Sequence, residues 1–146
     1  MGVMPQATIR IRVQFVDVDS SQRIHFTAMF RYMEVAEHHL MRSIGLPYAT
    51  ALQGPAFPRV HLSCDFRGAI VYDDELDVTA QIFAVGTSSW TVAFTAHNAS
   101  RLNSPVAAEG RMVIVAMDLA SERPIPLPEQ LRQAFTGSSS RLDEPC

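Results

Sequence analysis

The chain has 146 residues, of which 47% are hydrophobic and 18% are charged, and its formal net charge is −3. A chain of this length predicts one domain that buries a core without disulfides or metal. The weak negative charge and the lack of a long basic run argue against nucleic acid as a partner.

The sequence also lacks segments typical of membrane insertion or export. No stretch reaches the roughly 20 apolar residues that span a bilayer, and residues 1–10 lack the apolar core of a signal peptide. We therefore expect a cytoplasmic protein with no membrane partner. A bridge between Cys64 and the final residue, Cys146, is possible but not indicated. No Cys and His residues have metal-ligand spacing, so no metal is expected.

The first predicted element is a strand over residues 8–15. Apolar and polar side chains alternate along it, with Ile9, Ile11, Val13 and Phe15 on one face. This alternation is typical of a strand with one buried face.

A polar turn carrying Asp17 and Asp19 leads from this strand into a long helix that begins near Phe26 and is stopped by Gly45. The first N–H groups of a helix have no partner within it and carry partial positive charge, so they can hold an oxyanion. The helix is apolar on most sides, which predicts that a sheet wraps it, and its polar residues form one narrow stripe: Thr27, Arg31, Glu34, His38 and Arg42. A carboxylate beside the start of a helix is the predicted place for chemistry.

The rest of the chain is predicted to be mostly strands. Residues 47–58 form a proline-containing loop long enough to act as a flap over a pocket. Strands follow at 57–67, 76–85, 90–96 and 106–117, with a hairpin turn through residues 86–88. A short helix is predicted over 128–135 and a flexible tail over 137–146, so residues 1–136 are expected to form a single domain.

The strand over 57–67 is predicted to have two different faces. Val60, Leu62, Cys64 and Phe66 share one face, and the polar residues share the other: Arg59, His61, Ser63, Asp65 and Arg67. One helix cannot cover both faces of a five-stranded sheet. Either the far face is polar or it contacts another subunit, and the apolar content of the strands favours at least a dimer.

Several short motifs together resemble the hotdog fold and, more narrowly, the 4-hydroxybenzoyl-CoA thioesterase family. The resemblance covers residues 9 to about 117. It is carried by Phe15-Val16-Asp17-Val18-Asp19, Ile24-His25-Phe26, Phe30-Arg31-Tyr32-Met33-Glu34, Gly45-Leu46-Pro47, and the strand and turn from Phe66 through Tyr72-Asp73-Asp74-Glu75-Leu76.

The resemblance implies an α+β hotdog fold, with a five-stranded antiparallel sheet wrapped around one long central helix. It implies a homodimer or a homotetramer built as a dimer of dimers, with sites between subunits. The implied activity is metal-independent hydrolysis of acyl-CoA or acyl-carrier-protein thioesters, without a cofactor because coenzyme A is part of the substrate. Many relatives have glycine, then histidine or a hydrophobic residue, where this chain has Gln22 and Arg23.

The family's catalytic carboxylate falls on Asp19, and the backbone N–H that binds the thioester oxygen falls near Phe26. Asp19 would attack the carbonyl carbon or activate water. The alternative is that it only caps the helix or stabilises the helix dipole. Asp17 is expected to be structural, as a turn former or a partner of Arg10 or Arg12.

Other residues have a functional and a structural interpretation. His25 either orients the substrate or Asp19, as part of the catalytic group, or is a packed histidine. Glu34 either pairs with Arg31 or His38 or faces a pocket across the dimer.

Substrate-binding candidates lie outside the helix start. His61 and Ser63 would face the helix start of a second subunit or would form a solvated surface. Arg59, Arg101 and Arg111 would bind the phosphates of coenzyme A or be solvated. The predicted lining of an apolar acyl pocket consists of Phe26, Met29, Met33 and Phe57.

The sequence therefore predicts a cytoplasmic acyl-CoA thioesterase, a hydrolase acting on thioester bonds. Two alternatives are kept. One is a hydratase or dehydratase of acyl thioesters that uses His25 in acid-base chemistry, and the other is a non-catalytic acyl-CoA binding protein.

Overall fold

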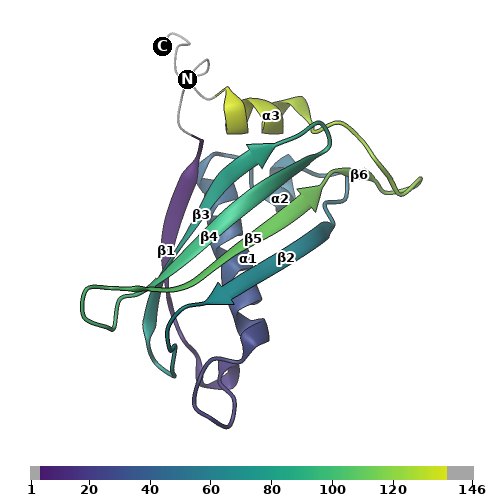
Figure 1. Ribbon diagram of the computed structural model, residues 1–146. Helices are drawn as coiled ribbons and strands as arrows, with labels where there is room; N and C mark the ends of the chain where they lie inside the picture. The colour runs from purple at the N-terminus through teal and green to yellow at the C-terminus, as the bar shows by residue number, and fades with distance from the viewer. Residues whose placement is uncertain (1–3, 138–146) are drawn as a thin grey trace.

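The computed structural model describes residues 4–137. Its main feature is a five-stranded sheet in the order β1-β3-β4-β5-β2, in which every neighbouring pair is antiparallel. The strands are β1 (Gln6–Arg12), β2 (Arg59–Phe66), β3 (Glu75–Val85), β4 (Ser89–Asn98) and β5 (Val106–Val115). Helix α1 (Phe26–Ser43) lies across one face of this sheet (Figure 1). The predicted architecture is confirmed.

The core lies between α1 and the inner face of the sheet. Strands β3 and β4 alternate strictly between buried and half-buried residues along most of their length, as the sequence pattern predicted. Their inward side chains meet an α1 face that is almost wholly apolar. The buried residues of α1 are Ala28, Met29, Tyr32, Met33, Ala36, Glu37, Leu40 and Met41.

Gly45 ends α1 as predicted. It has a φ of 81°, which favours glycine, and its N–H donates to the Arg42 carbonyl. The Leu46 N–H then donates to the Met41 carbonyl at 2.9 Å. These two bonds form a Schellman motif and satisfy carbonyls at the helix end.

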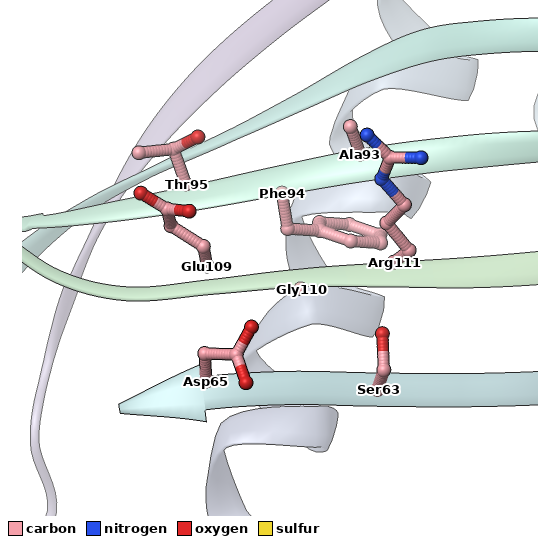
Figure 2. A pocket seen from close by; sticks show the side chains of 8 residues that line it. All are labelled: Ser63, Asp65, Ala93, Phe94, Thr95, Glu109, Gly110 and Arg111. Carbon is pink, nitrogen blue, oxygen red and sulfur yellow. The ribbon is translucent and has the colours of Figure 1, made fainter. Parts of the chain in front are cut away.

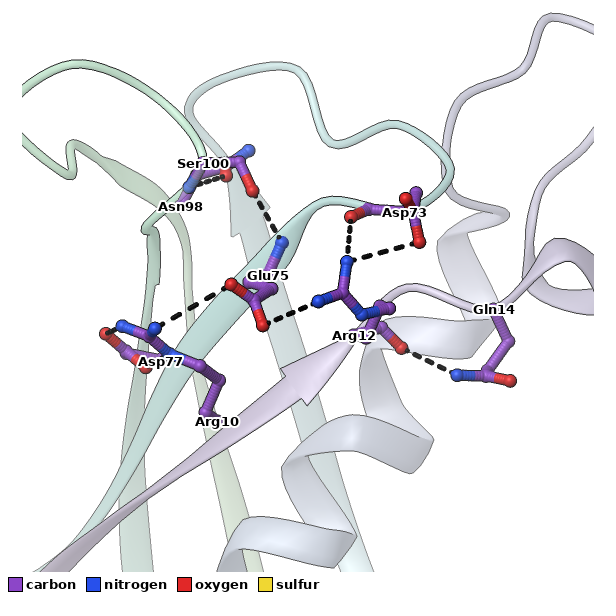
Figure 3. A network of polar contacts seen from close by, with 8 residues as sticks. All are labelled: Arg10, Arg12, Gln14, Asp73, Glu75, Asp77, Asn98 and Ser100. Carbon is purple, nitrogen blue, oxygen red and sulfur yellow. Dashed lines mark hydrogen bonds and ion pairs between the residues drawn. The ribbon is translucent and has the colours of Figure 1, made fainter.

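The outer face of the sheet is polar, which was one of the two alternatives for the far face. Arg10 on β1 makes two hydrogen bonds to Asp77 on β3, of 2.8 and 2.9 Å, and Arg12 bonds Glu75 at 2.9 Å (Figure 3). Thr8 and Thr79 share a further hydrogen bond of 2.7 Å. The predicted subunit contact stays a prediction.

The predicted extent of the first strand is wrong at its end. The β1 ladder stops at Arg12, and the short helix η1 (Phe15–Asp17) follows. The chain turns because the Asp17 N–H donates to the Gln14 carbonyl. Phe15 therefore leaves the buried face, and it is 68% exposed with its ring edge against Tyr72.

The predicted face of Arg59 is also wrong. The register of β2 against β5 shifts between Arg59 and His61, so that Arg59 lies opposite Ile114 while His61 lies opposite Val113. Such a bulge sends two successive odd-numbered residues to opposite faces. Arg59 consequently points to the helix side of the sheet, whereas His61 and Ser63 keep the outer face.

Short elements complete the chain. The predicted loop over 47–58 contains helix α2 (Tyr48–Ala51), and a small hairpin of β6 (Met117–Asp118) and β7 (Arg123–Pro124) was not predicted. Helix α3 (Glu129–Thr136) confirms the predicted terminal helix and packs near β3. The predicted tail lies outside the described residues, except for Gly137.

Gly110 on β5 generates a prediction about stability. A Cβ at this position would overlap the Met33 side chain and the Ser63 carbonyl oxygen, and a backbone atom cannot move aside cheaply. We expect Gly110→Ala to lower the free energy of unfolding by about 3 kcal/mol, the upper part of the usual range for overpacking. Urea denaturation followed by circular dichroism measures this loss.

Gly68→Ala is the matched control. The nearest atom to a Cβ there is the Ala107 Cα at 3.9 Å, so the substitution should change stability by less than about 0.5 kcal/mol. Equal stabilities of the two variants would show that the contact of Gly110 with α1 and β2 is not a constraint.

Candidate functional site

The loop that carries Asp19 is closed by its own backbone. Val18 and Ile24 form an antiparallel bridge, and the Asp19 N–H donates to the Arg23 carbonyl at 2.9 Å. The Gln22 N–H returns to the Asp19 carbonyl at 2.9 Å. Gln22 has a φ of 70°, the left-handed conformation that glycine adopts most readily.

Contacts on both sides fix this loop to the body of the protein. The His25 N–H donates to the Asp17 carbonyl at 2.8 Å, and the Ile24 N–H donates to the Ile70 carbonyl at 2.9 Å. Arg23 also bridges Val71 in the segment between β2 and β3. The loop is therefore held beside the start of α1.

The two carboxylate oxygens of Asp19 have different surroundings. Oδ1 accepts hydrogen bonds from the Ser21 N–H at 2.8 Å and the Ser21 hydroxyl at 2.5 Å. Within residues 4–137, no direct hydrogen bond to Oδ2 is formed, although the Arg23 N–H lies close enough to the carboxylate to favour its charged form. The bonds from Ser21 hold the pKa of Asp19 below its usual range, with a smaller contribution from His25. Asp19 is thus an exposed, ionised carboxylate with one free oxygen.

His25, and not Asp19, caps α1. The Thr27 N–H donates to His25 Nδ1 at 3.3 Å, and the Thr27 hydroxyl lies 2.7 Å from the same nitrogen. The His25 ring also stacks on Phe26, with ring centroids 4.7 Å apart and planes at 24°. Capping of the helix by Asp19 is therefore wrong, while its alternative role in stabilising the helix dipole stays a prediction.

The Phe26 N–H is an available donor at the helix start. It is the first helical residue, and no acceptor for its N–H lies among the described residues. The Phe26 side chain is 62% exposed, so its ring lies on the surface next to His25 and not in the core. Met29, three residues further on, is buried in the core.

Asp17 lies at the base of the loop and is only 3% exposed. Its carboxylate accepts hydrogen bonds from the Tyr32 hydroxyl at 2.5 Å and from both terminal nitrogens of Arg31. The predicted partners Arg10 and Arg12 are wrong, because both pair with carboxylates at the start of β3 or just before it. Asp17 instead joins η1 to the second turn of α1.

The pKa values around Asp17 follow from burial and pairing. Burial raises the pKa of the Asp17 carboxyl, but hydrogen bonds from Arg31 and Tyr32 outweigh it and the net shift is downward. Burial, together with Asp17, raises the pKa of Tyr32 to about 12. The group is therefore an ionised carboxylate held by one cation and one neutral phenol.

A second buried carboxylate, Glu37, was given no role in the sequence analysis. It is 0% exposed, and it accepts hydrogen bonds from the Tyr48 hydroxyl and from Arg59 at 2.8 and 3.0 Å. Burial raises the pKa of Glu37 and opposes the effect of Arg59. The guanidinium predicted to bind phosphates is thus committed to an internal ion pair. The sequence signal for this cluster was a glutamate among apolar helix positions. The sequence did not show which residues would pair with it.

The remaining candidates do not meet at Asp19 within one chain. His61 and Ser63 are exposed on the outer face of β2, and Ser63 lines a cavity of about 330 Å³ with Asp65, Thr95, Glu109 and Arg111 (Figure 2). Their expected approach to a second subunit's helix start stays a prediction.

Three further charged candidates have structural surroundings. Arg111 lies over the Phe83 ring at 3.8 Å, and Arg101 lies 4.0 Å from Asp74. Glu34 is exposed and forms no ion pair within residues 4–137. Its predicted pairing with Arg31 or His38 is wrong, and Arg31 is instead bound to Asp17.

Residues 4–137 contain neither a metal-binding cluster nor a membrane-spanning helix. No group of three or more His, Cys, Asp or Glu side chains in this range is arranged to hold a metal ion. None of the helices in the same range is long and apolar enough to cross a membrane.

Comparison with known proteins places these features in a family. Residues 22–104, more than half of the chain, match the family model described as the thioesterase superfamily. The fold is similar to that of a 1,4-dihydroxy-2-naphthoyl-CoA thioesterase from Synechocystis, with a TM-score of 0.82 and 21% identity over 96% of this chain and 99% of that one.

Two other solved structures are similar. A DHNA-CoA thioesterase from Staphylococcus aureus has a TM-score of 0.84 and 16% identity, covering 95% of this chain and 94% of its own. A gentisyl-coenzyme A thioesterase has a TM-score of 0.78 and 22% identity, covering 89% of this chain and 100% of its own.

The left-handed conformation of Gln22 leads to a prediction. A non-glycine residue there costs roughly 1–2 kcal/mol, which glycine avoids while losing more chain entropy on folding. We expect Gln22→Gly to leave the free energy of unfolding unchanged or raise it by up to about 1 kcal/mol. Thermal or urea unfolding provides the measurement.

Gln22→Val is the matched comparison, because a β-branched residue is disfavoured at positive φ. It should lower the free energy of unfolding by about 1 kcal/mol relative to the original chain. If Gln22→Gly is the less stable of the two variants, the left-handed turn does not limit this loop.

Proposed function

The chain belongs to the thioesterase superfamily, whose members hydrolyse thioester bonds, and on that premise we propose that its substrate is an acyl-coenzyme A and that Asp19 is the reacting carboxylate. The observation that carries the proposal is the Asp19 carboxylate itself. It is ionised, one oxygen is held by Ser21, and the other is free beside a helix start with an unpaired N–H. The family match begins at residue 22, so the role of Asp19 rests on this geometry.

The helix start supplies the electrophilic half of the reaction. The thioester carbonyl oxygen would accept a hydrogen bond from the Phe26 N–H, where the partial positive charge of α1 is strongest. Negative charge develops on that oxygen when the carbonyl carbon becomes tetrahedral. A donor aimed at the developing charge lowers the barrier more than it stabilises the bound substrate.

Asp19 supplies the nucleophilic half by one of two routes. In the first, Oδ2 bonds to the carbonyl carbon, the carbon–sulfur bond breaks, and water then cleaves the mixed anhydride to regenerate Asp19. In the second, Asp19 accepts a proton from a water molecule that attacks the same carbon. Both routes yield a carboxylic acid and the thiol. Both routes use the ionised carboxylate, which the lowered pKa of Asp19 maintains.

We propose an aromatic acyl group. Exposed rings flank the Asp19 loop: Phe26 stacks with His25, and Phe15 meets Tyr72 edge to face at 5.4 Å. Rings of this kind bind flat acyl groups by offset or edge contacts. Two of the similar solved structures are named as thioesterases of aromatic acyl-CoAs, the dihydroxynaphthoyl and gentisyl esters.

We also propose that the protein forms a homodimer or homotetramer. It would act in the cytoplasm and need no metal. Strand β2 is an edge of the sheet, and it exposes Val60, Leu62 and Phe66 by 60%, 44% and 45%. An open apolar edge favours pairing with a second chain. Such pairing would bring residues of one subunit near the Asp19 loop of the other.

The hydratase alternative is less well supported. It needs a histidine for acid-base chemistry, and His25 Nδ1 is engaged with Thr27. Thiol release from a panel of acyl-CoAs, without change in enoyl absorbance, would distinguish hydrolysis from hydration. Tight binding with neither signal would indicate a non-catalytic binding protein.

Replacing Asp19 tests the proposal directly. We expect Asp19→Asn to lower kcat by a factor on the order of 10²–10⁴, because the amide can neither attack nor accept the proton. The measurement is the rate of thiol release at saturating acyl-CoA. Circular dichroism should show an unchanged fold, since Asp19 is exposed.

Asp118→Asn provides the matched control. Asp118 is another exposed aspartate that accepts a hydrogen bond from a serine N–H, that of Ser121 at 2.8 Å, but it lies in the β6–β7 hairpin. It should retain full activity. Normal turnover by Asp19→Asn would remove Asp19 from the mechanism.

The pKa of Asp19 predicts the acid limit of activity. Protonation removes the reactive form, and the bonds from Ser21 favour the charged form, so activity should persist as pH falls and be lost only below the ordinary aspartate value of about 3.9. We expect Ser21→Ala to move this acid limit to higher pH. The profile of kcat/KM against pH measures the shift.

Ser20→Ala is the control, since Ser20 makes no hydrogen bond to Asp19. Circular dichroism at each pH separates titration from unfolding. If both serine variants have the same acid limit, the hydrogen bonds of Ser21 do not set the ionisation of the reacting group.

A further inference from the structure

The same type of polar cluster occurs twice along α1. The Asp17 clamp, formed by Asp17, Arg31 and Tyr32, lies near the helix start. The Glu37 cluster, formed by Glu37, Tyr48 and Arg59, likewise combines one buried carboxylate with a tyrosine hydroxyl and an arginine. Both satisfy a buried charge, but they hold different segments against the helix.

Asp17 contacts the candidate site through two different groups. Its carboxylate binds Arg31 and Tyr32 on α1, and its carbonyl accepts the His25 N–H at the end of the Asp19 loop. One residue therefore ties the beginning and the end of the loop to the rigid helix. Asp19 is two residues away along the chain, and Phe26 directly follows His25.

The other contacts that fix the loop lie at its two ends. Residues 19–23 are all exposed, so apolar packing does not restrain the segment that carries Asp19. Outside the Asp17 clamp, Arg23 and Ile24 make backbone contacts with residues 70 and 71, and the Val18 and Ile24 side chains pack against the core at the two ends of the loop. The Tyr32 hydroxyl adds a contact of its own, since it accepts the Gln14 N–H at 3.3 Å.

We propose that the Asp17 clamp is a positioning unit that sets the separation between the Asp19 carboxylate and the Phe26 N–H. Asp17, Arg31 and Tyr32 act through the loop and do not touch the substrate. The inference rests on the proposed function of Asp19. Its physical basis is that a misplacement of about 1 Å between reacting groups can cost on the order of 100-fold in rate.

Two matched tyrosine variants test the inference. Tyr32→Phe removes the hydroxyl from the Asp17 clamp, and Tyr48→Phe removes the corresponding hydroxyl from the Glu37 cluster. Both should lower the unfolding midpoint by a few degrees, because each leaves a buried carboxylate with one donor fewer. Only Tyr32→Phe should lower kcat, by about 10-fold to 100-fold, with KM changed less than threefold.

Arginine variants provide a second test that keeps the buried residues intact. Arg31 is 54% exposed, so Arg31→Met should fold and should lower kcat at least as much as Tyr32→Phe. Arg31→Lys retains the charge and should recover part of the loss. Equal kcat values for Tyr32→Phe, Arg31→Met and the original chain would overturn the inference.

Amide hydrogen exchange tests the same inference without activity. In Arg31→Met, exchange should accelerate at Asp19, Gln22 and His25, whose N–H groups close the loop, and stay slow at the centre of α1. Unchanged exchange in the loop would also overturn the inference. If the original chain releases no thiol but exchange accelerates as expected, the proposed function fails while the ordering of the loop by the Asp17 clamp stands.

Discussion

The structure depends on how two carboxylates are buried against one apolar helix. A charge removed from water must be paired and hydrogen-bonded, because otherwise the free-energy cost of desolvating it exceeds the stabilisation gained by packing. Asp17 meets this requirement through Arg31 and Tyr32, which forces η1 onto the start of α1. Glu37 meets it through Arg59 and Tyr48, which joins α1 to β2 and α2. The apolar face of α1 alone would let these segments shift.

Much of the fold could be predicted because its signals are local. Alternation along residues 76–96 and the glycine at position 45 depend only on neighbours in the chain, and both predictions were confirmed. The face of Arg59 could not be predicted, because a single bulge reverses the alternation. The partners of Asp17 lie 14 and 15 residues along the chain, beyond what local spacing shows.

The site was predicted in part for the same reason. The motif predicted a turn carrying Asp19 directly before a helix that begins near Phe26, and the structure has both. This prediction was possible because the two residues lie in one continuous segment. The capping role of His25 was missed, because histidine is not a preferred capping residue. The roles expected for His61 and Ser63 involve a second chain, whose position no pattern within one sequence defines. Met29, predicted to line an acyl pocket, lies in the core, as its position on the apolar face of α1 would suggest.

The bonds from Ser21 to Oδ1 of Asp19 form an Asx turn, in which a side-chain oxygen replaces a backbone carbonyl. The turn closes only when one methylene separates the carboxylate from the main chain. Glutamate, although it has the same charge, is too long to close it and would return rotamer freedom to the carboxylate. Only aspartate therefore fits this turn at position 19, because the length of the side chain, as well as its acidity, sets the direction of the carboxylate lone pairs that Ser21 leaves unbound.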